Sequence, residues 1–320
     1  TSSTRSLPLD YAFVRAYRAD PSGNVQFRKA SENFGPSFAK AARVAIAEVD
    51  EIVEVGEILP QDIGLPGIFV HRVVKKTVDV PHGDGVGNPL RRRPADSARE
   101  YLGKPALTRA GIARNAAQLL PEGSYVNLGI GIPTMVSNYL AGRDVTLHAE
   151  NGVLGYGELV SGEAVDPDVY NAGGQFVALN PGASFFDSVT SFEMARSRKL
   201  TAVILGGYQV DQQGNLANWK TNESNGGVGG AMDLVAGGGM LIITMEHWDS
   251  RGRPKLVRSL EYPPTGLDCV TAVVTDLAVF RREHGRPFAL EAVAPGFTPE
   301  DIRQLTNMQF DVAPRIRTML

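Results

Sequence analysis

The chain is best interpreted from two neighbouring strings, Val126-Asn-Leu-Gly-Ile-Gly-Ile-Pro-Thr134 and His148-Ala-Glu-Asn-Gly-Val-Leu-Gly-Tyr-Gly157. The first string belongs to an apolar run, 125–132, that is typical of a buried strand. Its two glycines, Gly129 and Gly131, indicate a turn at which the backbone lies close to a ligand, because glycine has no Cβ. These strings therefore predict a ligand site at the end of a buried strand.

A carboxylate follows the second predicted strand of this region. We expect a short helix at 134–141, because Pro133 is tolerated in a first helical turn, and then a strand at 145–149 that ends at Glu150. The Asn-Gly dipeptide directly after it favours a tight turn. A glutamate in this position fits a nucleophile, and a turn-capping residue on the surface is the alternative.

The composition is that of a globular protein with room for two cores. The chain has 320 residues, of which 43% are hydrophobic and 21% charged, and these values differ from those of disordered or membrane-embedded chains. No apolar run reaches the ~18 residues that span a bilayer, and no signal-peptide pattern opens the sequence. We therefore expect a cytoplasmic protein that does not bind membranes.

Charge, cysteine and histidine content exclude further classes. The formal net charge of -3 gives no basic field for nucleic acid, and Arg91-Arg92-Arg93 is interpreted as solvated linker. The single cysteine, Cys269, cannot form an internal disulfide and is expected to be an inert core thiol. The five histidines lack the spacing of metal ligands, so we expect no metal site.

An internal repeat divides the chain. Asp20-Pro-Ser-Gly-Asn-Val25 is echoed by Asp211-Gln-Gln-Gly-Asn-Leu216, and an apolar strand follows each copy, at 44–48 and at 241–246. Only the second copy has a long lead before it, 108–210. We infer that the front half of the first unit is supplied from elsewhere, as a separate polypeptide or as an upstream segment that is cleaved or lies outside this sequence; the alternative is a reduced domain that is complete in itself.

Three parts are predicted: 1–74, the C-terminal part of the first unit; 75–107, a Pro/Gly-rich interdomain linker; and 108–320, a complete second unit. Thr108 is expected to cap a helix that runs to Leu120. Further apolar strands are expected at 175–179, 202–205 and 241–245. Their alternation with helices predicts an α/β fold of mainly parallel sheets covered by helices, with functional loops at the carboxyl ends of the strands.

Five strings, in order, resemble the B subunit of family I coenzyme A transferases, the succinyl-CoA:3-oxoacid group. They are Asn127-Leu-Gly-Ile-Gly-Ile-Pro-Thr134, Glu150-Asn-Gly-Val-Leu-Gly155, Asn180-Pro-Gly-Ala-Ser-Phe-Phe-Asp187, Gly214-Asn-Leu-Ala-Asn-Trp219 and Gly229-Gly-Ala-Met-Asp-Leu234. The resemblance covers 108–310 as a nearly whole B subunit and 7–80 as the end of an A subunit. It implies two homologous units, the first of them incomplete in this chain.

The resemblance implies that Glu150 is the nucleophile of a ping-pong reaction. Its carboxylate attacks the acyl-CoA carbonyl to give a mixed anhydride, and the CoA thiolate returns to leave a glutamyl-CoA thioester, which the second acid discharges. The implied partners are acyl-CoA and carboxylic acid substrates, with no further cofactor. The favoured pair is succinyl-CoA and a 3-oxoacid such as acetoacetate, and acetate, butyrate or 3-oxoadipate are alternatives.

The resemblance also implies where CoA and the reaction's oxyanion bind. Oxyanion donors are expected at Gly229 and Gly230, whose amides can point at one anion. The expected CoA-binding residues are Asn127, Gly129, Gly131, Gly174, Gln175, Gly229, Gly230 and Ala231. Gly174 or Gln175 stands where some relatives carry a lysine, so the cation that would hold the substrate carboxylate stays unassigned. Asp233 and Glu246 are expected to fix turns or caps.

Two other functions stay open at this point. An acyl-CoA hydrolase on the same fold would discharge the thioester to water, and a non-catalytic sensor would bind a small acid through the same glycine turns. Retention of Glu-Asn-Gly favours the transferase. By resemblance we expect a homo-oligomer of complete two-unit modules.

Overall fold

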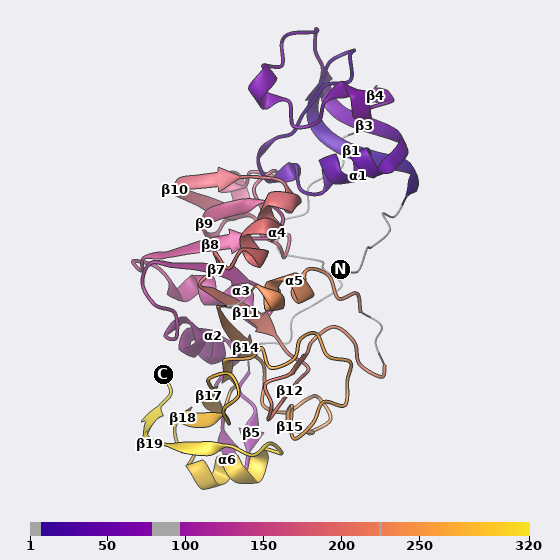
Figure 1. The fold of residues 1–320 in the computed structure, drawn as a ribbon. Helices are drawn as coiled ribbons and strands as arrows, with labels where there is room; N and C mark the ends of the chain where they lie inside the picture. The colour runs from indigo at the N-terminus through magenta and orange to yellow at the C-terminus, as the bar shows by residue number, and fades with distance from the viewer. Residues whose placement is uncertain (1–7, 79–96, 224–225, 238) are drawn as a thin grey trace. The chain divides into compact units, whose positions relative to one another are not determined.

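The computed structural model describes residues 8–78, 97–223, 226–237 and 239–320. The chain forms two compact units, which are described separately (Figure 1). The first contains Thr1–Gly87 and Ala149–Ser191, and the second contains Asn88–His148 and Phe192–Leu320. None of the helices in the described ranges combines the length and apolarity that crossing a bilayer requires.

The first unit is built on a small sheet. Its elements in the N-terminal segment are β1 (Leu9–Ala19), β2 (Val25–Gln26), α1 (Gly35–Ala41), β3 (Ala42–Ile52) and β4 (Arg72–Lys75). The strand order is β2-β1-β3-β4, in which β1, β3 and β4 are parallel and β2 pairs with the end of β1 in antiparallel fashion. Helix α1 packs on β1 and β3.

The two faces of this sheet are buried to different extents. Successive side chains of a strand point to opposite faces, and in β1 the residues Ala12, Val14 and Ala16 are buried. Phe13, on the other face of the same strand, is 78% exposed. A parallel sheet is ordinarily covered on both faces, so the exposure of Phe13 is a departure from that rule.

The second segment of this unit carries an antiparallel hairpin, β9 (Val153–Leu159) and β10 (Val177–Phe185). Polar contacts attach this segment to residues 28–33. The amide of Ala30 donates to the carbonyl of Asp168 at 3.0 Å, Lys29 forms an ion pair with Asp166, and Ser188 Oγ donates to Asn33 Oδ1 at 2.9 Å. These contacts explain why 149–191 belongs to the first unit.

The second unit holds the larger sheet. The strands of the unit as a whole are β5 (Glu100–Tyr101), β6 (Lys104–Pro105), β7 (Ser124–Leu128), β8 (Val145–Ala149), β11 (Ala202–Gly206), β12 (Gln209–Asp211), β13 (Leu216–Ala217), β14 (Met240–Thr244), β15 (Leu256–Val257), β16 (Ala272–Val274), β17 (Ala278–Arg281), β18 (Ala289–Val293) and β19 (Asp311–Thr318). The helices of this unit are α2 (Arg109–Ala117), α3 (Ile132–Met135), α5 (Ala231–Ala236) and α6 (Pro299–Leu305), and α4 (Ser188–Arg196) begins in the first unit and ends in the second.

The strands that this unit contributes to the sheet lie in the order β8-β7-β11-β14-β16-β17-β18-β19. The strands from β8 to β16 are all parallel, and β7, β11 and β14 lie side by side in Figure 1. Ile204, Ile242 and Val273, one in each of three successive strands, are fully buried. The predicted α/β fold with mainly parallel strands covered by helices is confirmed.

Helix boundaries differ from the prediction. Thr108 caps α2 as expected, with its side chain accepting from the amide of Gly111 at 3.3 Å, but α2 ends at Ala117 rather than Leu120. The predicted strand 125–132 ends at Leu128, because Gly131 adopts φ +98 and starts α3. The predicted helix at 134–141 is therefore two short helices, α3 and a 3-10 turn at Val136–Tyr139.

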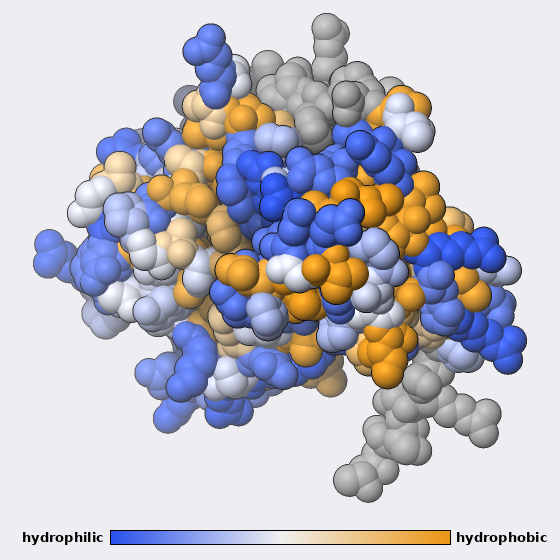
Figure 2. Space-filling model, turned by 90° about the horizontal axis from the view of Figure 1, so that it is seen from above, coloured by the Kyte–Doolittle hydropathy of each residue, from blue (hydrophilic) through white to orange (hydrophobic). Residues whose placement is uncertain are grey.

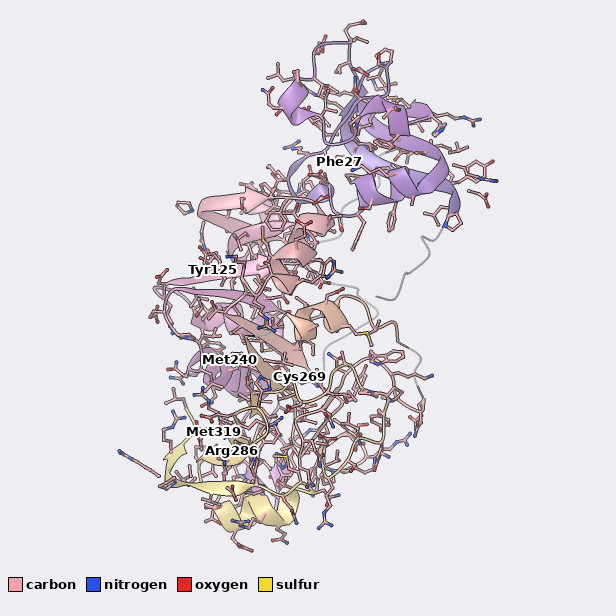
Figure 3. The ribbon with its side chains drawn as sticks, viewed as in Figure 1. Phe27, Tyr125, Met240, Cys269, Arg286 and Met319 are labelled. Atoms are coloured by element: carbon pink, nitrogen blue, oxygen red, sulfur yellow. The ribbon has the colours of Figure 1, made fainter. Side chains whose placement is uncertain are left out.

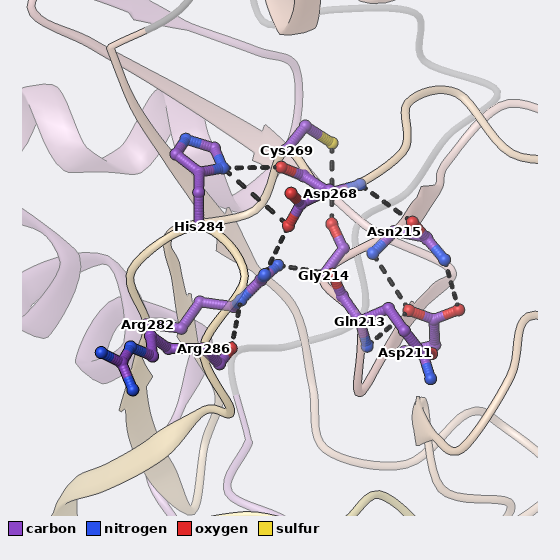
Figure 4. Close-up of polar contacts among 9 residues, drawn as sticks. All are labelled: Asp211, Gln213, Gly214, Asn215, Asp268, Cys269, Arg282, His284 and Arg286. Carbon is purple, nitrogen blue, oxygen red and sulfur yellow. Dashed lines mark hydrogen bonds and ion pairs between the residues drawn. The ribbon is translucent and has the colours of Figure 1, made fainter.

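The internal repeat is confirmed by its turn. Asp211 Oδ1 accepts from the amides of Gln213 and Asn215, both at 3.0 Å, and Asn215 Nδ2 donates to Asp211 Oδ2 at 2.8 Å (Figure 4). In the first copy Asn24 makes the same two bonds to Asp20, at 3.0 and 2.9 Å. Each turn also carries a glycine at positive φ, as an Asx-type turn favours.

The strands around the two turns also correspond. Seven residues before Asp20 and Asp211 lie Phe13 and Ile204, each in the first strand of a parallel ladder. The paired residues across three strands are Phe13, Ile46 and Arg72 in the first copy and Ile204, Ile242 and Ala272 in the second. The two copies therefore share one architecture of three parallel strands.

The contact-based units divide the chain differently from the predicted parts, because 149–191 packs with the N-terminal segment. The predicted boundaries at 74 and 108 concern the repeat units and stay predictions. The C-terminal end of the predicted linker 75–107 does pack: β5 and β6 pair, and buried Tyr101 donates its hydroxyl to Asp276 at 2.9 Å. The Arg91-Arg92-Arg93 run lies outside the described residues.

Candidate active site

Glu150 lies half-buried in the turn that follows β8. The amide of Gly152 donates to the carbonyl of Ala149 at 3.0 Å, and the Gly152 carbonyl accepts from the amide of Phe186 at 3.1 Å. Gly152 has φ +118, and a Cβ at this position would lie 2.0 Å from the carbonyl oxygen of Phe186. Only glycine fits here, so the Asn-Gly turn fixes Glu150 at the carboxyl end of a strand.

Asn151 is a site residue that the sequence reasoning missed. It is only 7% exposed, and its Nδ2 donates to the carbonyl of Tyr170 at 2.9 Å. Its buried Oδ1 has no hydrogen-bond partner among the described residues. An unsatisfied buried acceptor is unfavourable, and here it lies next to the predicted nucleophile. It could accept an N–H group from a bound ligand.

Gly174 and Gln175 form a tight turn in the same unit. Asn171 Oδ1 accepts from the amides of Gly173 at 2.9 Å and Gln175 at 3.1 Å, and Asn171 Nδ2 donates to Gln175 Oε1 at 3.3 Å. The side chain of Gln175 is therefore held by its own turn. Because Tyr170 leads into this turn and accepts from Asn151, the first unit brings the Glu150 turn and the Gly174–Gln175 turn together.

Asn127 lies in the second unit and is buried, with 1% of its surface exposed. Its Nδ2 donates to His148 Nδ1 at 3.0 Å and lies 3.3 Å from the His148 carbonyl oxygen. Burial lowers the pKa of His148 to about 4, so the ring is neutral at pH 7 and accepts through Nδ1. Asn127 thus connects β7 to the end of β8 through hydrogen bonds. Its predicted contact with CoA stays a prediction.

This arrangement predicts acid lability. Because the pKa of His148 falls from 6.5 unfolded to about 4 folded, the unfolded chain binds a proton more readily between these values. The free energy of unfolding should therefore fall by about 3 kcal/mol from this group as the pH drops from 7 to 4. Chemical denaturation of His148→Gln across this range should show a free energy of unfolding that depends less steeply on pH. The same pH dependence as in the parent would contradict the assignment. His284→Gln, at an exposed site, is the control.

The glycine turn after β7 has one packed and one open position. The amide of Gly129 donates to the carbonyl of Ile204 at 2.8 Å, and a Cβ on Gly129 would lie 3.0 Å from the side chain of Leu205. At Gly131, with φ +98, no atom lies within 4 Å of where a Cβ would be. Glycine at 129 therefore allows close packing against β11, whereas Gly131 leaves the backbone accessible to a ligand.

The predicted oxyanion turn precedes α5. Gly229 is exposed at φ +55 with open space around it, and Gly230 is the residue before the helix. The described backbone supplies no carbonyl acceptor for the amide of either glycine. Ala231 differs, because its amide donates to the carbonyl of Val228 at 3.3 Å. The first two amides are thus available to an anion, whereas that of Ala231 is used within the turn.

Several other residues make structural contacts within the second unit. Asp233 accepts from Arg196 at 2.9 Å, and Glu246 accepts from Arg109 at 3.1 Å. Cys269 lies on the loop before β16 (Figure 3), and burial raises the pKa of its thiol to about 11, so it is protonated and unreactive at neutral pH. A search of the described residues finds no group of three His, Cys, Asp or Glu side chains that could hold a metal ion.

The predicted site residues divide between the two units. Glu150, Gly174 and Gln175 belong to the first unit, whereas the residues of the β7 and α5 turns belong to the second. Asn151 joins the first group through Tyr170, a link made by residues 19 apart in sequence. Its only signal in the sequence is its place between Glu150 and a glycine that must adopt positive φ.

This combination of fold, repeat and turn is that of one family of proteins. The family model described as coenzyme A transferase matches residues 3–76 and 110–305, and the chain belongs to this family. The expectation drawn from the five sequence strings is thereby confirmed.

Among its relatives is the mitochondrial succinyl-CoA:3-ketoacid coenzyme A transferase 2B of Mus musculus, 39% identical over 323 residues, which cover 98% of this chain and 60% of the relative. Another is the beta subunit of the acetate CoA-transferase of Escherichia coli K12, 45% identical over 209 residues, which cover 65% of this chain and 95% of the relative. The chain thus spans 60% of the length of the mouse relative.

A solved structure has the same fold. The acyl-CoA transferase YdiF of Escherichia coli O157:H7, as the apoenzyme, matches 98% of this chain and 63% of its own length, with a TM-score of 0.74 and 20% sequence identity. At this identity the likeness concerns the fold alone. It agrees with the α/β architecture described above.

Proposed function

We propose that this chain carries the nucleophile of a CoA transferase that moves CoA between short-chain carboxylic acids. Glu150 attacks the acyl-CoA carbonyl and expels CoA thiolate, which gives a mixed anhydride. The thiolate then attacks the glutamyl carbonyl of this anhydride, which releases the first acid as its carboxylate and leaves a glutamyl-CoA thioester. The second acid then attacks the thioester and reverses the two steps. CoA enters as a substrate, and these steps require no further cofactor.

The observation that carries this proposal is the position of Glu150. The turn that holds it is closed on both sides by backbone hydrogen bonds and admits no side chain at Gly152. A rigidly placed carboxylate at the end of a parallel strand is preorganised for attack, because little freedom is lost in the reaction. The unsatisfied Oδ1 of Asn151 beside it offers an acceptor for an amide of the pantetheine arm.

The developing negative charge on the thioester oxygen requires donors. The amides of Gly229 and Gly230 are the donors that we assign to it, because both lack a backbone acceptor among the described residues and precede a helix. Removal of one such donor typically slows a reaction by ~10²–10³-fold.

For the acids, we propose succinyl-CoA and a 3-oxoacid such as acetoacetate. The name of the mouse relative, whose match covers 98% of this chain, supports this pair. Acetate and 3-oxoadipate are the alternatives, since the beta subunit of an acetate CoA-transferase and the B subunit of a 3-oxoadipate CoA-transferase match 65% and 63% of the chain.

Mass spectrometry tests the proposal directly. The purified protein is incubated with succinyl-CoA and digested, and the peptide that holds Glu150 should gain the mass of CoA less water. Added acetoacetate should remove this adduct. Discharge by water alone at the same rate would instead identify an acyl-CoA hydrolase, and the absence of any adduct in an active preparation would contradict the nucleophile.

We further infer that a segment outside this sequence completes the first unit, either as a separate or cleaved polypeptide or as an upstream part of the same protein. In the second repeat Ile204 is fully buried, and the strand that holds it is paired with β7 through Leu128. Phe13, its counterpart, is 78% exposed, and in the described part of the chain residues 9–17 of β1 have a strand on one edge only. Tyr11 and Phe38 are also exposed in this unit. Apolar patches are visible on the surface in Figure 2.

The repeat specifies what such a partner must supply. In the second repeat α2 and α3 pack on the sheet and β7 extends it beside β11, and all three elements come from the segment 108–139. The partner is therefore a chain that adds a parallel strand beside Phe13 and helices over it, and complete modules of this kind would form the multi-subunit enzyme. Intact mass spectrometry distinguishes a second polypeptide from a longer single chain, and in either case hydrogen exchange at residues 9–17 should be slower when the segment is present.

A further inference from the structure

A cavity of about 710 Å³ in the second unit contains none of the residues assigned to the proposed reaction. It lies beside the loop that follows β14, and its wall includes Arg99, Arg109, Glu246 and Lys255. Cavities of this size are ordinary for small-molecule sites. What distinguishes this one is the arrangement of its charges.

Two of its cations share one carboxylate. Arg109 approaches Glu246 Oε1 at 3.1 Å, and Arg99 approaches Glu246 Oε2 at 3.4 Å. Arg99 also donates to the carbonyls of Trp248 and Asp249, at 2.9 and 3.1 Å. These bonds hold both guanidinium groups in place at the cavity.

Lys255 is the third cation. Its backbone is fixed on both sides, since its amide donates to the His247 carbonyl at 3.0 Å and its carbonyl accepts from the Val210 amide at 3.0 Å. The described residues give its ammonium group neither a hydrogen bond nor an ion pair. Burial lowers the pKa of Lys255 to about 8, and the attraction of Glu246 opposes this shift. A half-buried ammonium without a partner is unfavourable until an anion meets it.

The remaining charged groups around the cavity have partners of their own. Arg253 binds Asp249 at 2.7 Å, and Arg251 forms an ion pair with Glu223. Glu261 accepts from Gln209 at 3.3 Å. Asp276, which also faces Lys255 electrostatically, accepts from Tyr101 at 2.9 Å and from the His247 amide at 2.6 Å. Among the described residues of the cavity wall, Lys255 is therefore the cation left without a partner.

We propose that this cavity is a binding site for a small oxyanion, such as a phosphate, sulfate or carboxylate group, with Lys255 as its direct ligand and Arg99 and Arg109 beside it. Guanidinium groups suit such anions because their N–H donors match paired oxygens. The site is distinct from the proposed catalytic residues, so its ligand would act as a regulator or stabiliser.

Sulfate is a suitable probe because its charge does not change between pH 6 and 9. At constant ionic strength, calorimetric titration at pH 7 should show sulfate binding to the full chain, with Kd raised about tenfold or more in Lys255→Met. Lys199→Met, at an exposed site, is the matched control and should bind as the parent does. An acetate titration in parallel should reveal which oxyanion class binds more tightly.

The pH dependence distinguishes a direct ligand from a structural effect. Binding to the parent should weaken as the pH rises from 7 to 9, because Lys255 loses its proton near pH 8. Lys255→Arg should keep its affinity at pH 9, because arginine stays charged. Equal binding by the parent and by Lys255→Met, or a loss of sulfate binding in Lys255→Arg with its fold intact by circular dichroism, would overturn the proposal.

Discussion

Replacing Glu150 by glutamine is expected to slow CoA transfer by at least ~10⁴-fold, because the amide cannot form the anhydride or the thioester, and loss of a nucleophile has effects of this size. Glutamine has the shape of glutamate, so the turn closed by Gly152 and Phe186 should be unchanged. The measurement is the rate of acetoacetyl-CoA formation from succinyl-CoA, in a preparation in which the parent chain is active. The CoA adduct on the peptide should vanish as well.

The control is another glutamate of the same unit. Glu163 lies exposed in a 3-10 turn at Gly162–Ala164, so Glu163→Gln should keep the parent rate within a factor of about two. A Glu150→Gln variant that retains more than a hundredth of the parent rate would rule out a covalent role for this carboxylate. Full activity with no adduct in either protein would point to direct transfer between the substrates.

The sequence allowed the Glu150 turn to be predicted because its signals are local. A buried parallel strand, a carboxylate and an Asn-Gly pair lie within a few residues of one another, and the structure adds the reason for the glycine, which is the carbonyl of Phe186. The repeat was visible for a similar reason. Asp20 and Asp211 each bond to an asparagine four residues later, so the motif is preserved as a short string.

Features that depend on distant residues could not be predicted. The placement of 149–191 with the N-terminal segment rests on pairs such as Lys29 and Asp166, which are 137 residues apart. Asn151 gains its role from Tyr170, and Asn127 is bound to His148 instead of facing solvent. No periodicity reports such pairs, because helix and strand patterns record only which face of an element is buried.

Errors at the ends of elements had a different cause. Apolar residues continue past the end of β7 to Ile132, so hydrophobicity alone extended the predicted strand, whereas the backbone turns at Gly131 with φ +98. Because glycine adopts both negative and positive φ, Gly131 alone did not indicate that the strand ends before it.

The second large effect is expected at Gly152. Alanine there would place its Cβ 2.0 Å from the carbonyl oxygen of Phe186 and would have to adopt φ +118. Overpacking and backbone strain each cost about 1–3 kcal/mol, so Gly152→Ala should lower the free energy of unfolding by about 3 kcal/mol or more. Urea denaturation of the purified variant, followed by circular dichroism, measures this loss.

A substitution at a second glycine, Gly162, separates the cost of backbone strain from that of the steric clash with Phe186. Gly162 in the same unit also has positive φ, +64, but no atom lies within 4 Å of a Cβ placed on it. Gly162→Ala should therefore cost only about 1 kcal/mol, the backbone term alone. Equal losses in the two variants would mean that Phe186 moves aside without cost. Gly152→Ala can also fold and yet lose the CoA adduct. This result would mean that the close contact between Gly152 and the carbonyl of Phe186 holds the Glu150 turn in its reactive geometry.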